Sequence, residues 1–323
     1  MAVAAPREKL PPSVAARPER RRRPSRGRIA KRARNVALYA VLVPFSIVFI
    51  APFAWLVSSS LKPLGDIFVW PPQWIPENPT LANYELFLGL GKDDARSAEF
   101  VGRWFLNSAF VALSITALQL FFNSLAAYAF AKREFPGRTP IFILFLATMM
   151  IPGQVTLIPT YLVIRHMPLF GGNDIWGQGG HGWLDSYYGL ILPGAVSAFG
   201  IFFLRQYMLS IPNELLDAAR IDGASEFRIY WKIILPLTRP ALAATGIFTF
   251  MYAWEDFFWP LIIITSPDLY TVPLGLTLYV VRNRTAWDIV MAGSVLATLP
   301  MILMFVIFQR HIIRGITLGG LKG

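Results

Sequence analysis

The segment Ile211–Leu242 reads IPNELLDAARIDGASEFRIYWKIILPLTRPAL and lies between two apolar runs, Tyr187–Met208 and Ala241–Thr265. Each run is long enough to cross a bilayer, which takes about 20 mostly apolar residues. A charged segment between two such runs leaves the membrane and folds at its surface. This segment therefore predicts a membrane domain with a loop that a partner outside the membrane can bind.

The rest of the composition fits a membrane protein. Of 323 residues, 55% are hydrophobic and only 15% are charged, whereas a soluble domain has about 25% charged residues. Six apolar runs reach the length of a span: Val36–Val57, Phe105–Ala131, Ile141–Ile164, Tyr187–Met208, Ala241–Thr265 and Ile289–Phe308. We predict an all-α membrane protein with six transmembrane helices and a two-helix cytoplasmic loop.

Basic residues set the predicted orientation and the ends of the domain. The net charge is +11, and residues 1–35 alone contain twelve Lys or Arg. Because Lys and Arg favour the cytoplasmic side, both termini are expected in the cytoplasm. We predict a disordered basic tail over 1–35 that lies against lipid and does not bind nucleic acid, a permease domain over 36–312 with its loop at 211–236, and a cytoplasmic tail over 313–323.

Several kinds of chemistry are excluded or disfavoured. The chain has no cysteine, its three histidines lie far apart, and it contains no Gly-x4-Gly-Lys-Ser/Thr phosphate loop. No metal site and no catalytic residues are therefore expected. An intramembrane enzyme is disfavoured because Glu255 and Asp256 alone are a weak catalytic pair. A secondary transporter is also disfavoured, since no convincing internal repeat is found.

The loop itself predicts two short helices. Asn213 is placed to cap the first helix, Gly223 to end it in a left-handed conformation, and Ser225 to cap the second. Pro236 is expected to end the second helix and Pro240 to open the next span. An apolar stripe in the second helix predicts the residues that anchor the loop to the bundle: Phe227, Tyr230 and Trp231.

A surface amphipathic helix would explain that stripe but not the small pair Ala218-Ala219 beside Asp217. Small side chains let another backbone approach closely, so the pair suits insertion into a groove of a partner. The spacing resembles the Glu-Ala-Ala-x3-Gly-x9-Ile-x-Leu-Pro loop of permease subunits of ABC importers, with Asp in place of Glu. The residues that match, and that we expect to couple to an ATPase, are Asp217, Ala218, Ala219, Gly223, Ile233, Leu235 and Pro236.

Further segments narrow the resemblance to carbohydrate permeases of the maltose-transporter type, closest to the shorter six-span subunit. They are Phe248–Ile263, Met291–Pro300 and the C-terminal QRHIIRGITLGGLKG. The resemblance implies a second homologous permease, two copies of a cytoplasmic ABC ATPase that hold ATP and Mg, and an external sugar-binding protein. It implies a bacterial or archaeal cytoplasmic membrane and no cofactor on this chain. A permease for an amino acid or phosphate is the alternative within the class.

Two further sites are predicted. Ionisable residues within a span are functional candidates, so Glu255 and Asp256, with Trp254 and Asn123, are candidates for the sugar path. The alternative is that the acids pair with basic groups and hold the bundle together. Outside, the glycine-rich segment 168–188 carries Trp176 and Trp183, which are candidates for contact with the binding protein or, alternatively, for a passive interfacial loop.

Overall fold

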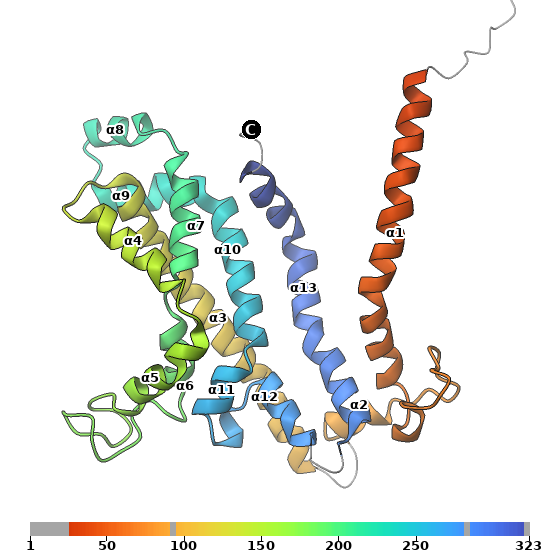
Figure 1. Cartoon of the computed structure of the whole chain (residues 1–323). Coiled ribbons are helices and arrows are strands. Elements are labelled where there is room, and N and C mark those ends of the chain that lie inside the picture. The colour runs from red at the N-terminus through yellow and green to blue at the C-terminus, as the bar shows by residue number, and fades with distance from the viewer. Residues whose placement is uncertain (1–25, 91–94, 281–284, 320–323) are drawn as a thin grey trace, which may run out of the picture. The chain divides into compact units, whose positions relative to one another are not determined.

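The computed structural model describes residues 26–90, 95–280 and 285–319, and within these ranges every regular element is helical, which confirms the predicted all-α fold (Figure 1). The α-helices are α1 Arg26–Ser60, α2 Ala82–Phe87, α3 Ala95–Lys132, α4 Arg138–Thr148, α5 Gly153–Arg165, α6 Tyr187–Ile191, α7 Ala198–Leu209, α8 Glu214–Ile221, α9 Glu226–Ile229, α10 Leu235–Glu255, α11 Phe258–Ile263, α12 Val272–Leu276 and α13 Trp287–Gly319. Short turns of other helix types are η1 Leu64–Asp66, η2 Leu192–Gly194, η3 Tyr230–Ile234, η4 Pro267–Leu269 and η5 Thr277–Tyr279.

The chain divides into two compact units, Met1–Phe53 and Ala54–Gly323, which we describe separately. The first contains most of α1, a single helix of 35 residues with Pro44 and Pro52 inside it. This helix begins at Arg26, so residues 26–35 do not belong to a disordered tail. The remainder of the predicted tail, 1–25, lies outside the described residues. At the other end α13 runs to Gly319, and most of the predicted C-terminal tail is therefore helical.

Five helical segments of the described chain are long and apolar enough to cross a membrane, and a sixth span exists if one bent pair is counted. That pair is α4 and α5, which meet at 102°. The span predicted over Ile141–Ile164 is therefore this bent pair and not one continuous helix. Pro152 explains the break, because proline has no N–H to donate and pushes the residue before it out of the helical region.

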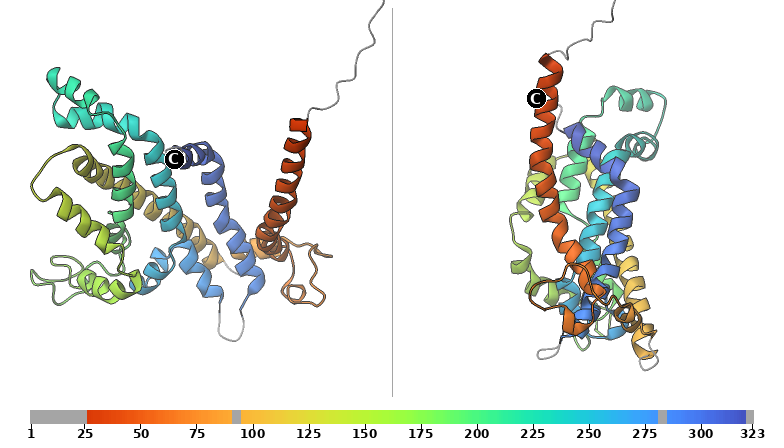
Figure 2. Two further views of the ribbon diagram at one scale, coloured as in Figure 1. Left: turned by 45° about the horizontal axis from the view of Figure 1, so that its top comes forward. Right: turned by 90° about the vertical axis from the view of Figure 1, so that its right-hand side faces the viewer.

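Close helix packing builds the second unit around α3. α3 packs against α7 and α10, and α13 packs against α10 (Figures 1 and 2). A Cβ atom at Gly200 of α7 would lie 2.3 Å from Nδ2 of Asn123 on α3, so only glycine allows this approach. Small residues at such crossings are typical of membrane bundles, where association depends on close van der Waals contact.

Pro236 does not end a helix. The chain is helical without interruption from α9 through η3 into α10, and Pro236 lies in the first turn of α10. The turn η3 is a π-helix over Tyr230–Ile234. Its wider turn lies just before the proline, at the place where a regular hydrogen bond would need the missing N–H. Pro240, expected to open this span, lies inside α10.

Candidate functional site

The two-helix loop folds largely as its turn residues require. Gly223 has φ +75° and follows α8, and the Ser225 hydroxyl accepts a hydrogen bond from the Arg228 N–H at 3.4 Å. Asn213 does not cap α8 with its side chain. Its Oδ1 accepts from Nζ of Lys132 at 2.8 Å, and the same ammonium donates to the Ile211 carbonyl at 2.5 Å. The start of the loop is thereby fastened to the end of α3.

The residues of the ABC-permease motif face two ways. Asp217 and Ala218 are exposed on α8, whereas Ala219 is half-buried against an apolar cluster. Buried members of that cluster are Leu216, Ile229, Tyr230 and Ile234, with Ile233 and Leu235 packed around them. The first part of the motif is thus available to a partner, and the last part holds the loop on the bundle.

Of the three predicted anchor residues, only Tyr230 is buried. Its hydroxyl lies 2.8 Å from that of Ser124 on α3, and its ring centroid is 5.6 Å from that of Tyr128. Phe227 is 64% exposed and Trp231 is 46% exposed. The stripe that their spacing predicts therefore leaves two aromatic residues on the surface.

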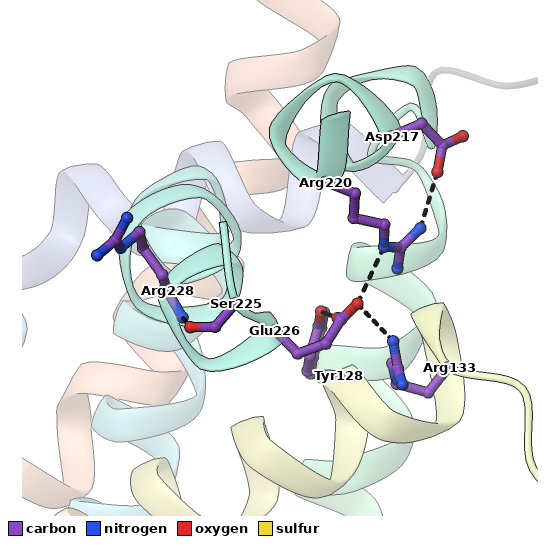
Figure 3. A network of polar contacts seen from close by, with 7 residues as sticks. All are labelled: Tyr128, Arg133, Asp217, Arg220, Ser225, Glu226 and Arg228. Atoms are coloured by element: carbon purple, nitrogen blue, oxygen red, sulfur yellow. Dashed lines mark hydrogen bonds and ion pairs between the residues drawn. The ribbon is translucent and has the colours of Figure 1, made fainter. Parts of the chain in front are cut away.

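A polar network, shown in Figure 3, connects α8, α9 and the end of α3. Glu226 is its centre: Oε1 lies 2.5 Å from Nη1 of Arg133 and accepts from Nε of Arg220 at 2.9 Å. Its Oε2 accepts from the Tyr128 hydroxyl at 2.6 Å. Arg220 also donates to Asp217 at 2.7 Å, which connects the motif acid to the network.

The network is a feature that the sequence patterns missed. The hydrogen bond to Glu226, together with the one to Asp217, raises the pKa of Arg220, so this guanidinium stays charged. A single exposed ion pair stabilises by only about 0–1 kcal/mol, but a network with fixed geometry is worth more. The one available signal was the basic pair Lys132-Arg133 directly after a span, on the side predicted to hold the loop.

A cavity of about 780 Å³ lies among the membrane helices of the second unit. Its walls come from the middle of α3, from α5, from the segment 190–200, from the second half of α10 and from the segment 256–259 that leads into α11. Polar and aromatic residues line much of it: Gln119, Thr156, Thr160, Ser197, Phe199, Thr245, Phe248, Thr249, Tyr252, Asp256 and Trp259. A cavity of this size lies within the range of small-molecule sites, about 300–1,000 Å³.

The structure separates the four residues predicted for the sugar path. Asp256 lines the cavity, where its Oδ1 accepts from the Trp259 N–H at 3.3 Å. Trp254 is 4% exposed and donates from Nε1 to the Ala297 carbonyl on α13 at 3.0 Å, and so belongs to the core. Asn123 is fully buried and accepts from the Ser197 N–H at 3.1 Å. Glu255 is exposed and is not among the residues that line the cavity.

The glycine-rich segment 168–188 is compactly folded. The Asn173 amide donates to the carbonyls of Arg165 and Met167, and the Asp185 carboxylate accepts from both backbone N–H groups of Thr265 and Ser266 at 2.9 Å. Trp183 is half-buried and packs its ring against Phe170 and Tyr188, whereas Trp176 is 78% exposed..

Helices long enough to cross a membrane, a cavity among them and a loop held to the ends of these helices together indicate a membrane transport protein. The family model described as "Binding-protein-dependent transport system inner membrane component" matches residues 26–318. The chain belongs to this family and is a multi-pass inner membrane protein.

Relatives and one solved structure agree with this assignment. The chain is 34% identical over 289 residues to the arabinooligosaccharides transport system permease protein AraQ of Bacillus subtilis, covering 90% of this chain and 96% of the relative. It is 33% identical to the sn-glycerol-3-phosphate transport system permease protein UgpE of Escherichia coli O1:K1 / APEC, covering 87% and 92%. A chain from the crystal structure of a bacterial ABC transporter involved in import of the acidic polysaccharide alginate superposes with a TM-score of 0.72 at 22% identity, over 87% of this chain and 97% of that one, which supports the fold.

Proposed function

We propose that this chain is one of two homologous permease subunits of an ATP-driven sugar importer and forms half of its translocation path. Two copies of an ABC ATPase hold ATP and Mg on the cytoplasmic side, where both termini lie. An external binding protein delivers the sugar. The observation that carries the proposal is the exposed motif acid Asp217 with Ala218 on a loop fastened to the bundle, in a chain similar over 90% of its length to an arabinooligosaccharide permease.

The ATPase contact is proposed for α8. Asp217 offers a carboxylate to a basic group of the ATPase, and the small side chain of Ala218 lets the ATPase backbone approach closely. Two apolar side chains flank them, Leu215 at 46% and Ile221 at 86% exposure, and such exposed apolar groups are typical of a surface that a partner covers. Ala219, Ile233, Leu235 and Pro236 would then act through the packing of the loop.

Two connections can carry a displacement of α8 into the bundle. The first is covalent, because α9 continues through η3 into α10. The second is the polar network from Glu226 to Arg133 and Tyr128 at the end of α3. Since α3 and α10 both line the cavity, closure of the ATPases can change its shape and expose it alternately to each side. Continuous helices and hydrogen-bond networks are among the connections that carry energetic coupling between distant sites.

On the external side we propose Trp176 as the contact with the binding protein. A tryptophan 78% exposed at a loop held by side-chain hydrogen bonds to the backbone offers a large surface at little entropic cost. Trp183 supports that loop from within. Trp176→Ala is expected to weaken stimulation of the ATPase by the binding protein several-fold, with unchanged basal ATPase activity. Equal stimulation of the variant and the parent would remove Trp176 from the interface.

Reconstitution tests the function as a whole. The chain, its partner permease and the ATPases in proteoliposomes should accumulate sugar only with ATP inside and binding protein outside. Asp217→Asn should lower uptake, while Glu134→Gln, at an exposed acid outside the loop, should not. Uptake that persists without ATP, or accumulation of amino acids or phosphate with no sugar, would contradict the proposal.

A further inference from the structure

The wall of the cavity is unusual in its charge. Asp256 is the one charged residue among those that line it, and no Lys, Arg or His of the described chain belongs to that lining. The ion pairs found among the described residues do not include Asp256. Its carboxylate therefore faces the cavity without a compensating cation, and one of its oxygens caps the turn at Trp259.

Hydrogen-bond donors in this wall are mostly committed within the chain. The threonine hydroxyls donate to carbonyl oxygens or to Gln119: Thr156 to Gly153, Thr160 to Thr156, Thr245 to Ala241 and Thr249 to Oε1 of Gln119. The Gln119 amide donates to Gly194, and the Trp259 indole donates to Gly189. A hydroxyl that donates one bond still has lone pairs that accept, so the threonines offer the cavity mainly acceptors. The hydroxyls of Ser197 and Tyr252 also line it and remain available as donors.

Aromatic faces complete the wall. Phe199 and Phe248 are about half-exposed, and Tyr252 is 78% exposed. All three line the cavity. An aromatic ring offers an apolar surface with a partially negative face, which suits the C–H faces of a sugar ring. The ring face provides no favourable partner for an anion, and the Tyr252 hydroxyl is the one polar donor among these three residues.

From these features we propose that this wall selects a neutral, hydroxyl-rich saccharide and rejects an anionic one. Sugar hydroxyls donate to Asp256 and to the threonine oxygens, and the sugar ring packs on Tyr252 and its aromatic neighbours. A carboxylate, sulfonate or phosphate group offers oxygens that only accept and meets a negative charge. At about 5 Å, with an effective dielectric constant of about 20, this repulsion disfavours the anion by on the order of a hundredfold.

The inference rests on the proposed function and specifies its substrate class. The neutral substrate proposed for this chain differs from the anionic substrates in the names of two similar proteins above. One of them is named for a glycerol phosphate and the other for an acidic polysaccharide.

The test must separate this chain from the external binding protein, which has a preference of its own. The complete membrane complex is placed in nanodiscs without binding protein, and equilibrium dialysis measures its affinity for radiolabelled trisaccharides. Three pairs are used, in the gluco, galacto and manno series, and the members of each pair differ only in a C6 hydroxymethyl or carboxylate. We expect at least one neutral member to bind about a hundredfold more tightly than its uronate.

Asp256→Asn keeps the oxygen that caps Trp259. This variant should bind the neutral sugar about tenfold more weakly and the uronate more tightly than the parent does. Glu255→Gln, the adjacent acid outside the lining, is the matched control and should change neither affinity. Equal binding of neutral and acidic members, binding of none, or equal effects of the two variants would overturn the inference. ATP-dependent uptake in proteoliposomes with binding protein, measured in parallel, reports separately on the proposed function, because it can fail or succeed whatever the dialysis shows.

Discussion

The surface loop 211–236 and the membrane cavity differ in how their residues are distributed along the sequence and in how their charges are paired. The loop is contiguous in sequence and its motif acid is exposed. Three of its charged residues, Asp217, Arg220 and Glu226, form ion pairs that reach Arg133. The cavity draws its lining from distant segments, and the ion pairs among the described residues do not include Asp256. The difference fits the roles proposed above for the two regions. A transmission element must keep its geometry under load, whereas a binding wall must leave its polar groups open to a ligand.

The largest effect is expected from a bulky substitution on the exposed face of the loop. Ala218→Trp should reduce association of the ATPase by about a hundredfold or more, because the new side chain fills the surface that a partner backbone must approach. Co-purification of the ATPase with the membrane subunits measures it. Thr139→Trp, at another exposed position, is the control for bulk alone. Normal recovery of the ATPase with Ala218→Trp would remove α8 from the interface.

A smaller effect is expected when the connection behind that face is weakened. Glu226→Gln removes the charge that pairs with Arg133 and Arg220, a loss of about 1–3 kcal/mol for charge-assisted hydrogen bonds. Uptake per ATP hydrolysed should fall about tenfold while the ATPase still associates. Tyr128→Phe removes one neutral donor and should have a weaker effect. If Glu226→Gln and Tyr128→Phe leave coupling unchanged, the covalent connection through α10 suffices.

Packing around the cavity gives the next effect. Gly200→Ala places a Cβ atom 2.3 Å from Asn123 and should destabilise the bundle by about 1–3 kcal/mol through overpacking. A lower midpoint in thermal unfolding of the purified chain measures the change. Gly102→Ala is the matched control, since nothing lies within 4 Å of a Cβ atom there, and it should be neutral or slightly stabilising. Equal midpoints for the two variants would show that α3 and α7 yield at this contact.

The smallest effect concerns the glycine-rich segment 168–188, where the Asp185 carboxylate accepts hydrogen bonds from Thr265 and Ser266. Burial alone would raise the pKa of Asp185, but hydrogen bonds from Ser266 and Thr265 outweigh it and lower the pKa. A carboxyl whose pKa is lowered by folding stabilises the folded state fully at a pH above its pKa in the unfolded chain, which is near 4. This stabilisation is lost as the pH falls through its pKa in the folded state. The contact of Asp185 with Thr265 and Ser266, here called the clamp, should therefore form at neutral pH and open below about pH 4.

Hydrogen exchange at Thr265 and Ser266 measures that clamp. Asp185→Asn should speed their exchange at pH 7 by about tenfold, an opening that is easier by roughly 1.4 kcal/mol. Asp174→Asn is a control, because Asp174 accepts from Trp176 and Gln178 within the same segment and does not reach Thr265. Unchanged exchange in Asp185→Asn would assign the order of this segment to its backbone turns.

The sequence by itself determined the class of fold, the loop and the motif within it. Apolar length and periodic helix signals are local, and so are a glycine after a helix and a serine before one, as at Gly223 and Ser225. The membrane excludes most other secondary structures for these apolar runs, because the backbone groups of a helix in lipid must form hydrogen bonds within that helix. For these reasons five spans and the loop could be predicted from the order of residues alone.

Tertiary structure decided which side chains meet. Glu226 is 93 residues from Arg133, and Trp254 and Asp256 are almost adjacent in sequence yet lie in the core and in the cavity wall. The helix α10 ends at Glu255 and the backbone of Asp256 is extended, so the side chains of Trp254 and Asp256 face different surroundings. Proline positions were ambiguous for a related reason: Pro152 accompanies a break of 102° while Pro236 lies within a continuous helix. The outcome depended on whether neighbouring turns could accommodate the missing hydrogen bond, as the π-turn at η3 does.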